Sequence, residues 1–222
     1  MSKALIFLGA PGSGKGTQAK LLQEKFDFIQ ISTGDLLRKE VSMGTSLGLK
    51  IKSVINSGKL VNNNLVEELL KVNVNEKQNY IFDGFPRSLE QAMFLENFLL
   101  SKNIKLLKVF YFEIDINYVI KRILDRKICA ICKKEFNITL HKIKNDICPN
   151  CNKPSLLVRG DDNEFTIRNR IQVYLEETFP ILDFYKKKNK DILIRINAMD
   201  AIDVVFQNIS TNLSVILNED KY

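Results

Sequence analysis

The chain has 222 residues, of which 45% are apolar and 27% charged, a composition that is ordinary for a globular protein with a sizeable core. No apolar run approaches the roughly 20 residues of a membrane-spanning helix, and no signal peptide precedes the first apolar segment, so we expect a cytoplasmic protein without membrane contact. The net charge of +7 suits either a nucleic acid or a strongly anionic small substrate.

Apolar runs typical of buried strands alternate along the chain with amphipathic stretches typical of helices. The predicted strands cover 4–8, 80–82, 106–112 and 192–196, and a short extended run at 28–31 is a candidate fifth. The predicted helices cover 18–26, 65–72, 88–100, 118–126, 166–187 and 201–213. This alternation predicts a parallel sheet with helices on both faces and ligands beyond the carboxyl ends of the strands.

Two segments interrupt the alternation. Residues 33–73 are helical with polar breaks and contain no strong strand, and residues 127–163 are irregular and rich in cysteine. We expect each to be a small insertion flanking the loop that follows the first strand.

That loop, residues 9–17, reads Gly-Ala-Pro-Gly-Ser-Gly-Lys-Gly-Thr between the first strand and the first helix, the layout of a phosphate-binding loop. Its glycines let backbone N–H groups converge, the helix start adds positive dipole, and Lys15 brings a charge to the terminal phosphates. A glycine-rich corner without function is the alternative, but strand, spacing and lysine all agree with phosphate binding. Gly16 stands where many such loops have a metal-binding Ser or Thr, which argues against a GTPase-like switch or a motor ATPase.

The four cysteines form two Cys-x-x-Cys pairs separated by fifteen residues: Cys129, Cys132, Cys148 and Cys151. This spacing favours a tetrahedral thiolate site, with zinc as the expected metal and iron as the alternative. Two disulfides or redox-active pairs are further alternatives, which a cytoplasmic location and the clustering disfavour. Four thiolates leave no open coordination position, so the metal should be structural.

Charged residues also follow the later elements. Asp83 directly follows the strand 80–82, and its carboxylate can hold a metal-bound water there. Four residues later, the forked guanidinium of Arg87 can bind phosphate. Further arginines would suit a substrate with several phosphates, although any one of them could be an ordinary surface residue: Arg122, Arg126, Arg159 and Arg170.

Taken together, these motifs resemble the adenylate kinases, specifically the long bacterial type with a zinc-bearing lid, from Lys3 to about Ile209. The resemblance rests on 9–18, Thr-Gly-Asp-Leu-Leu-Arg at 33–38, Gly-Lys-Leu-Val at 58–61, Asp-Gly-Phe-Pro-Arg at 83–87 with Gln91, 122–126, and Arg-Gly-Asp-Asp at 159–162 with Arg170. It implies a P-loop NTPase-like, five-stranded parallel sheet with helices on both faces. The core domain would comprise 1–32, 74–126 and 164–222, the AMP-binding insertion 33–73, and the zinc-ribbon-like lid 127–163.

The resemblance also implies site residues. The ATP side would be Gly12, Ser13, Gly14, Lys15, Gly16, Thr17, Arg122, Arg126, Glu135, Phe136 and Asp200. The AMP side would be Thr33, Arg38, Lys59, Leu60, Val61, Gly84, Phe85, Pro86, Arg87, Gln91, Arg159 and Arg170. The developing charge would be spread by Lys15, Arg38, Arg87, Arg122, Arg126, Arg159 and Arg170, with Asp83 holding Mg²⁺ through water.

The implied reaction is reversible, Mg²⁺-dependent phosphoryl transfer from ATP to AMP, in a monomer that binds no nucleic acid and carries structural zinc. Local explanations remain open for two residues, since Ser-Leu-Glu-Gln at 88–91 is also a capping box and Thr33 a plausible N-cap. The chain departs from the family at Phe165, at Ala198 and in lacking a Pro-Pro segment between the cysteine pairs.

Two other functions compete with this one. Another nucleoside monophosphate kinase, of the UMP/CMP or GTP:AMP type, would share most motifs, although the long cysteine-bearing lid argues against the UMP/CMP type. A zinc-ribbon nucleic-acid-binding NTPase would explain the charge and the cysteines, but the ribbon lacks interleaved aromatic residues on which bases could stack.

Overall fold

A five-stranded parallel sheet forms the centre of the protein, in a computed structural model that describes residues 1–219. The strands lie in the order β2-β3-β1-β4-β8, and every neighbouring pair is parallel. Their bounds are β1 Ser2–Gly9, β2 Ile29–Ser32, β3 Tyr80–Asp83, β4 Ile104–Glu113 and β8 Leu193–Asn197. The predicted sheet is thus confirmed, and the short run near residue 30 is its fifth strand.

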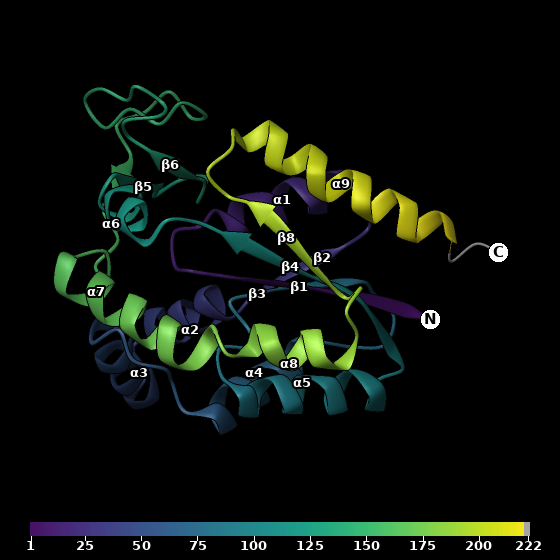
Figure 1. The fold of residues 1–222 in the computed structure, drawn as a ribbon. Coiled ribbons are helices and arrows are strands. Elements are labelled where there is room, and N and C mark those ends of the chain that lie inside the picture. Colours follow the sequence, from purple (N-terminus) through teal and green to yellow (C-terminus); the bar gives the residue numbers. More distant parts are fainter. Residues whose placement is uncertain (220–222) are drawn as a thin grey trace.

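Helices cover both faces of this sheet (Figure 1). On one side lie α4 (Asn63–Asn73), α5 (Leu89–Ser101), α7 (Glu164–Val173) and α8 (Ile181–Lys188), and on the other α1 (Lys15–Lys25) and α9 (Ile202–Glu219). Successive side chains of β1 point to opposite faces, so Ala4 and Ile6 enter one apolar core while Leu5 and Phe7 enter the other. The helix α6 (Ile116–Leu124) packs Val119 and Ile123 into the first core.

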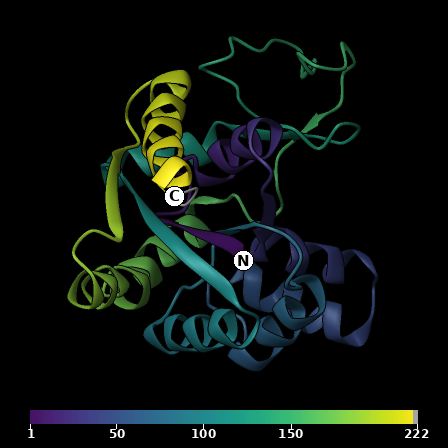
Figure 2. The same ribbon diagram turned by 90° about the vertical axis from the view of Figure 1, so that its right-hand side faces the viewer.

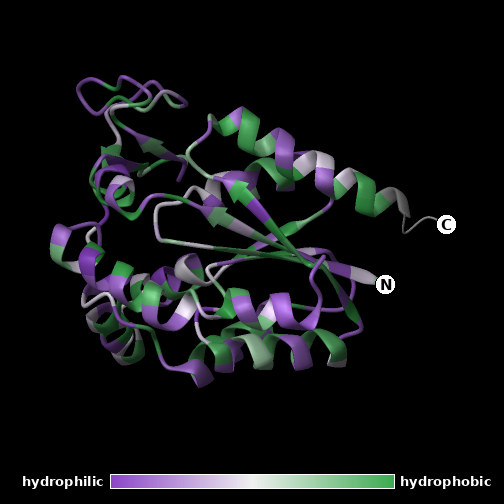
Figure 3. Cartoon of the chain, in the orientation of Figure 1, coloured by the Kyte–Doolittle hydropathy of each residue, from purple (hydrophilic) through white to green (hydrophobic). Residues whose placement is uncertain are grey.

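The two segments that interrupted the alternation form a group of helices, of which α4 packs its Val66 and Leu70 into the core of the sheet, and a small second sheet. Residues 33–73 contain α2 (Thr33–Ser42), α3 (Ser46–Asn56) and α4. The lid segment forms a small antiparallel sheet in the order β6-β5-β7, from β5 (Arg126–Cys129), β6 (Glu135–Asn137) and β7 (Leu156–Leu157). In Figure 2 the lid rises above the central sheet and the helices of 33–73 lie below it. The extended lid loop is mostly hydrophilic (Figure 3), in keeping with its small core of Cys129, Cys148 and Leu156.

The predicted helix over 166–187 is wrong, because the structure divides it. After α7 comes a π-helix, η1 (Tyr174–Thr178), and α8 begins only at Ile181. Pro180 explains the division, since proline has no N–H and its ring would clash with the carbonyl of Glu176 in a continuous α-helix. The wider turn instead bonds the N–H of Phe179 to the carbonyl of Tyr174 over 2.8 Å.

Other element boundaries move by a few residues. The helix α1 begins at Lys15 rather than 18, and α9 runs to Glu219, beyond the predicted 213. The strand β5 begins at Arg126, one residue before the predicted start of the lid. Among residues 1–219, no helix combines the length and the apolar character needed to cross a bilayer.

Candidate active site

A cavity of about 350 Å³ opens at the carboxyl ends of the central strands. Its walls come from the phosphate loop (residues 9–17), from the insertion 33–73, from the turn after β3 and from the lid. Every residue predicted for the two nucleotide sites lines it, as does Asp83. Residues spread over most of the chain therefore converge on one space.

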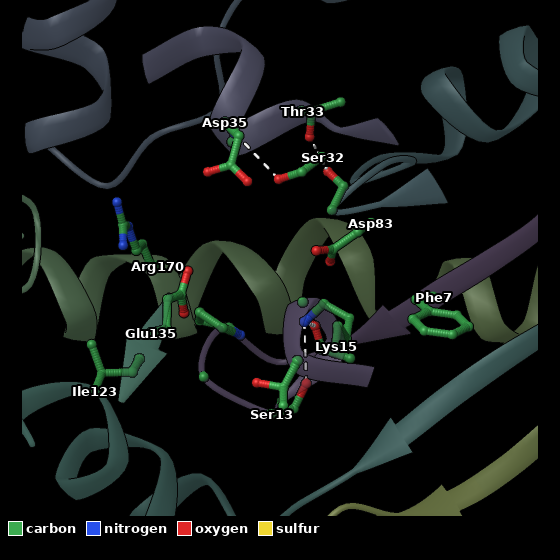
Figure 4. A pocket seen from close by; sticks show the side chains of 18 of the residues that line it. Phe7, Ser13, Lys15, Ser32, Thr33, Asp35, Asp83, Ile123, Glu135 and Arg170 are labelled. Carbon is green, nitrogen blue, oxygen red and sulfur yellow. Dashed lines mark hydrogen bonds between the residues drawn. The ribbon is translucent and has the colours of Figure 1, made fainter. Parts of the chain in front are cut away.

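The phosphate loop has the backbone geometry of an anion site. Gly12 and Gly14 have φ angles of 77° and 94°, and a Cβ at Gly12 would lie 2.6 Å from Ile123, so these two positions require glycine. No side chain caps α1, which leaves its first N–H groups and its positive dipole for a ligand. Lys15 Nζ donates to the carbonyls of Gly9 and Ala10 over 2.9 and 2.8 Å, and to Oγ of the neighbouring Ser13 over 3.1 Å (Lys15 and Ser13 are labelled in Figure 4).

Lys15 and Asp83 form an opposed pair of half-buried charges beside this loop (Figure 4). Burial lowers the pKa of Lys15 to about 8, although Asp83 acts in the opposite direction. Burial likewise raises the pKa of Asp83, against the effects of Lys15 and of a 2.9 Å hydrogen bond from Gln30 Nε2. A Cβ at Gly16 would lie 3.2 Å from Asp83 Oδ2. The carboxylate therefore borders the space in which a Ser or Thr side chain would begin, which accounts for glycine there.

The turn after β3 is held by hydrogen bonds to its own carbonyl. Thr33 Oγ1 and Arg87 Nε donate to the carbonyl of Gly84 over 2.7 and 2.8 Å. Thr33 is consequently not the N-cap of α2, and that alternative is wrong: Ser32 caps the helix by accepting the N–H of Asp35 over 3.3 Å.

For Gln91, the capping-box explanation holds only in part. Ser88 Oγ accepts the N–H of Gln91 over 3.3 Å, as expected of an N-cap. The Gln91 side chain, which lines the cavity, does not complete a capping box; its Oε1 accepts the N–H of Arg87 over 2.8 Å. The cap thus places Gln91 where it supports the arginine.

Two buried carboxylates hold the arginines of the cavity. Arg126 donates Nε and Nη2 to Asp162 over 2.8 and 2.6 Å. Arg170 pairs with Asp161, and Arg38 Nη1 lies 4.0 Å from the same carboxylate. Although burial raises the pKa of Asp161, Arg170 and Arg38 hold it below its usual value. Sequence reasoning included both aspartates in a motif but gave them no part in the site.

Glu135 adds a third carboxylate to this cluster from the lid strand β6. It pairs with Arg159 and lies 3.8 Å from Arg126 Nη1. Burial lowers the pKa of Arg159 while Glu135 opposes that effect. Glu135, predicted for the ATP side, therefore lines the cavity among guanidiniums, with Arg170 nearby in Figure 4.

A turn before α9 closes the other end of the cavity. Arg122 Nη1 donates to the carbonyl of Ala198 over 2.9 Å, and Gln18 Nε2 donates to that of Ile202 over 2.9 Å. Asp200 lines the cavity between them. Gln18 and Ile202 were not predicted, because their contribution depends on the packing of α1 against α9.

Other cavity residues were missed for similar reasons. Gln30 lies on an edge strand, and Val173, Tyr174 and Thr178 belong to a segment that read as uninterrupted α-helix. No local motif distinguishes them. The spacing of apolar residues, every second residue in strands and every 3.6 residues in helices, indicates which side chains are buried, not which lie close to a ligand.

The four cysteines lie apart from the cavity, in the lid, as free thiols. Their sulfur atoms all lie within 4.8 Å of one another, with Cys129 to Cys151 at 3.9 Å and Cys132 to Cys148 at 3.8 Å. Four thiolates bound at ~2.3 Å to a tetrahedral zinc ion lie about 3.8 Å from one another, so the donor set fits such an ion. His141, exposed and hydrogen-bonded to Asn137, is not one of these ligands.

Comparison with known proteins agrees with this geometry. The profile of the family described as adenylate kinase matches residues 7–190. The chain belongs to the adenylate kinase family. The adenylate kinases of Hydrogenobaculum sp. and Mycoplasma mycoides are each 42% identical to it, over 94% and 95% of this chain and 99% of their own length. That of Fervidobacterium nodosum is 44% identical over 84% of this chain and 87% of its own length.

Membership confirms the predicted family and the P-loop NTPase-like fold. As an adenylate kinase, the chain is an ATP:AMP phosphotransferase. The cavity contains groups that suit such a reaction, namely backbone donors, several cationic side chains and carboxylates.

Proposed function

We propose that this adenylate kinase binds MgATP over the phosphate loop and AMP against residues 33–73, and that it transfers the γ-phosphoryl group directly between them. One observation carries the assignment: a single cavity brings the phosphate loop and the turn at 83–87 together, with guanidiniums between them. Phosphoryl transfer depends on alignment and charge stabilisation, and this arrangement supplies both without a covalent intermediate.

On the donor side, the backbone N–H groups of the phosphate loop bind the phosphates and Lys15 contacts the transferred group. Its ammonium group now donates to loop carbonyls and would turn to the phosphate oxygens. The further donor residues are those predicted from the family, Arg122, Arg126, Glu135, Phe136 and Asp200, all of which line the cavity.

On the acceptor side, Arg87 and Arg38 bind the AMP phosphate while Gln91 and the 59–61 segment contact the nucleoside. Arg159 and Arg170 lie between the two nucleotides, where their charge counters that of the equatorial oxygens. The remaining acceptor residues are Thr33, Gly84, Phe85 and Pro86.

Asp83 is the residue that would hold Mg²⁺, through water. Its carboxylate is half-buried, lies near Lys15 and accepts a hydrogen bond from Gln30, which suits a hard cation that prefers oxygen ligands. When bound, Mg²⁺ supplies charge neutralisation on the transferring phosphates. Gln30 fixes one carboxylate oxygen for that purpose.

The lid, residues 127–163, would carry structural zinc and close over ATP, while 33–73 closes over AMP. Both movements exclude water, which would otherwise compete with AMP for the phosphoryl group. We also propose that the protein is a monomer that acts in the cytoplasm on its two nucleotides.

AMP is expected to be the preferred acceptor, with kcat/KM at least ~100-fold above that for UMP or CMP, because a site that hydrogen-bonds one base leaves polar groups unpaired with another. The measurement is ADP formation from ATP plus AMP, with ATP alone as the control for hydrolysis. UMP or CMP reacting comparably would overturn the acceptor assignment, and a parallel series with GTP defines the donor.

Arg87→Lys is expected to raise KM for AMP at least ~10-fold and to leave KM for ATP nearly unchanged. Lysine keeps the charge but loses the planar fork that binds phosphate bidentately, and it also loses the Nε–H bond to Gly84. Steady-state kinetics with each substrate varied in turn measures both constants. Unchanged AMP kinetics would remove Arg87 from the acceptor site.

A further inference from the structure

The π-helix η1 lies along the cavity. It contains one more residue than an α-turn would, so the side chains that follow are rotated by about 100° relative to a continuous helix. Val173, Tyr174 and Thr178 line the cavity, whereas Leu175 is 43% exposed on the outside. Turns of this kind occur often at functional sites, and here the turn flanks the acceptor side.

Thr178, the last residue of η1, makes a hydrogen bond to the acceptor side of the cavity. Its side chain is 8% exposed, and Oγ1 donates to the backbone carbonyl of Arg87, 91 residues away in sequence, over 2.8 Å. A hydroxyl group has a single proton to donate, and this bond uses it. The Thr178 hydroxyl therefore donates to the backbone of Arg87 and not to another group.

Arg87 is fixed by bonds at three points. Its N–H is bonded to Gln91 Oε1 over 2.8 Å, its Nε to the carbonyl of Gly84 over 2.8 Å, and its carbonyl to Thr178. Gln91 and Gly84 belong to the same local turn and helix as Arg87, whereas Thr178 ties them to a distant helix. Without Thr178, the peptide unit after Arg87 would lose its connection to the other wall of the cavity.

We propose that Thr178 is a positioning residue for acceptor binding, which acts by holding the Arg87 backbone so that the guanidinium meets the AMP phosphate. The inference rests on the proposed function in one respect, that Arg87 contacts the acceptor. Small displacements of such a group are costly, because bidentate binding of phosphate depends on both distance and angle.

The test compares Thr178→Val with Thr178→Ser. Valine keeps the shape and removes the hydroxyl, leaving the carbonyl without its donor, so kcat/KM for AMP should fall ~5–30-fold while KM for ATP stays within about twofold. Serine keeps the hydroxyl and should restore AMP kinetics to within about threefold of the wild type. Leu175→Ala, in the same turn but on its exposed side, is the matched control and should change neither constant.

A double-mutant cycle shows whether Thr178 acts through Arg87. In the Arg87→Lys background, the loss of log kcat/KM for AMP caused by Thr178→Val should be less than half of the loss in the wild type. The reason is that the guanidinium fork that Thr178 positions is no longer present. Fully additive effects, or AMP kinetics unchanged in Thr178→Val, would overturn the inference. Failure of the proposed function is distinguishable, since Arg87→Lys alone would then leave AMP kinetics unchanged.

Discussion

Lys15→Met is expected to lower kcat by ~10²–10³-fold while the protein remains folded. Lys15 is the cation at the start of α1, and one charged group aimed at a developing charge is typically worth that much in a water-excluded site. Methionine has a similar length and flexibility, so it fills the same space without the charge. The measurement is kcat with both nucleotides saturating, together with the thermal midpoint of unfolding.

Lys25→Met is the matched control. Lys25 lies at the far end of the same helix, where its ammonium group sits over the rings of Phe26 and Phe206 and does not line the cavity. Its removal should leave kcat unchanged. A Lys15 variant that keeps more than about a tenth of the wild-type kcat would contradict the role of Lys15 in charge stabilisation.

Removing the metal should unfold the lid first and leave the central sheet intact. The apolar cluster of the lid consists of Leu156 and the cysteines themselves, with Phe136 and Ile143 packed against it. Metal binding supplies an apparent ~10–16 kcal/mol in small Cys-rich units, more than so small a cluster can gain by burial. Activity should fall as well, since Glu135 and Arg126 lie on the lid strands that the metal stabilises.

Hydrogen exchange after chelation measures this effect segment by segment. Loss of protection in 127–157 with retained protection in β1 and β4 is the expected result, and a second tetrahedral metal such as Co²⁺ should restore turnover because a full thiolate shell takes no part in the chemistry. Freshly purified protein without a bound ion, or a cobalt spectrum that shows a water ligand, would contradict the prediction. Metal analysis at the same stage distinguishes zinc from iron.

Local motifs explain why most of the site could be predicted. The phosphate loop lies within nine consecutive residues between a strand and a helix, and Asp83 ends a strand, so their convergence follows from the rule that parallel strands bring their carboxyl ends to one edge. The spacing of the cysteines likewise predicts a tetrahedral thiolate site by itself. Such features need no knowledge of long-range packing.

The incorrect or missing predictions share a different origin. Ser32 and Thr33 are both good N-caps, and only the carbonyl of Gly84, some 50 residues on, decides that Thr33 turns away from the helix. Thr178 lies in a segment whose sequence is typical of a continuous helix. The sequence does not show how Pro180 alters the preceding turn, or that the Thr178 hydroxyl donates to the carbonyl of Arg87. Where two local solutions have similar energies, tertiary contacts decide between them.

The carboxylates around the guanidiniums have a consequence for affinity. Asp161, Asp162 and Glu135 already pair with Arg170, Arg126 and Arg159, so a nucleotide phosphate does not meet bare cations at these three side chains. When a nucleotide binds, its phosphates replace the carboxylates as partners of these arginines. The dissociation constant therefore reflects the difference in free energy between arginine–phosphate and arginine–carboxylate pairs. A ligand with a single small charge gains little from that exchange, whereas a polyphosphate gains at several arginines at once. The cluster therefore selects for the number of phosphates as well as for their position.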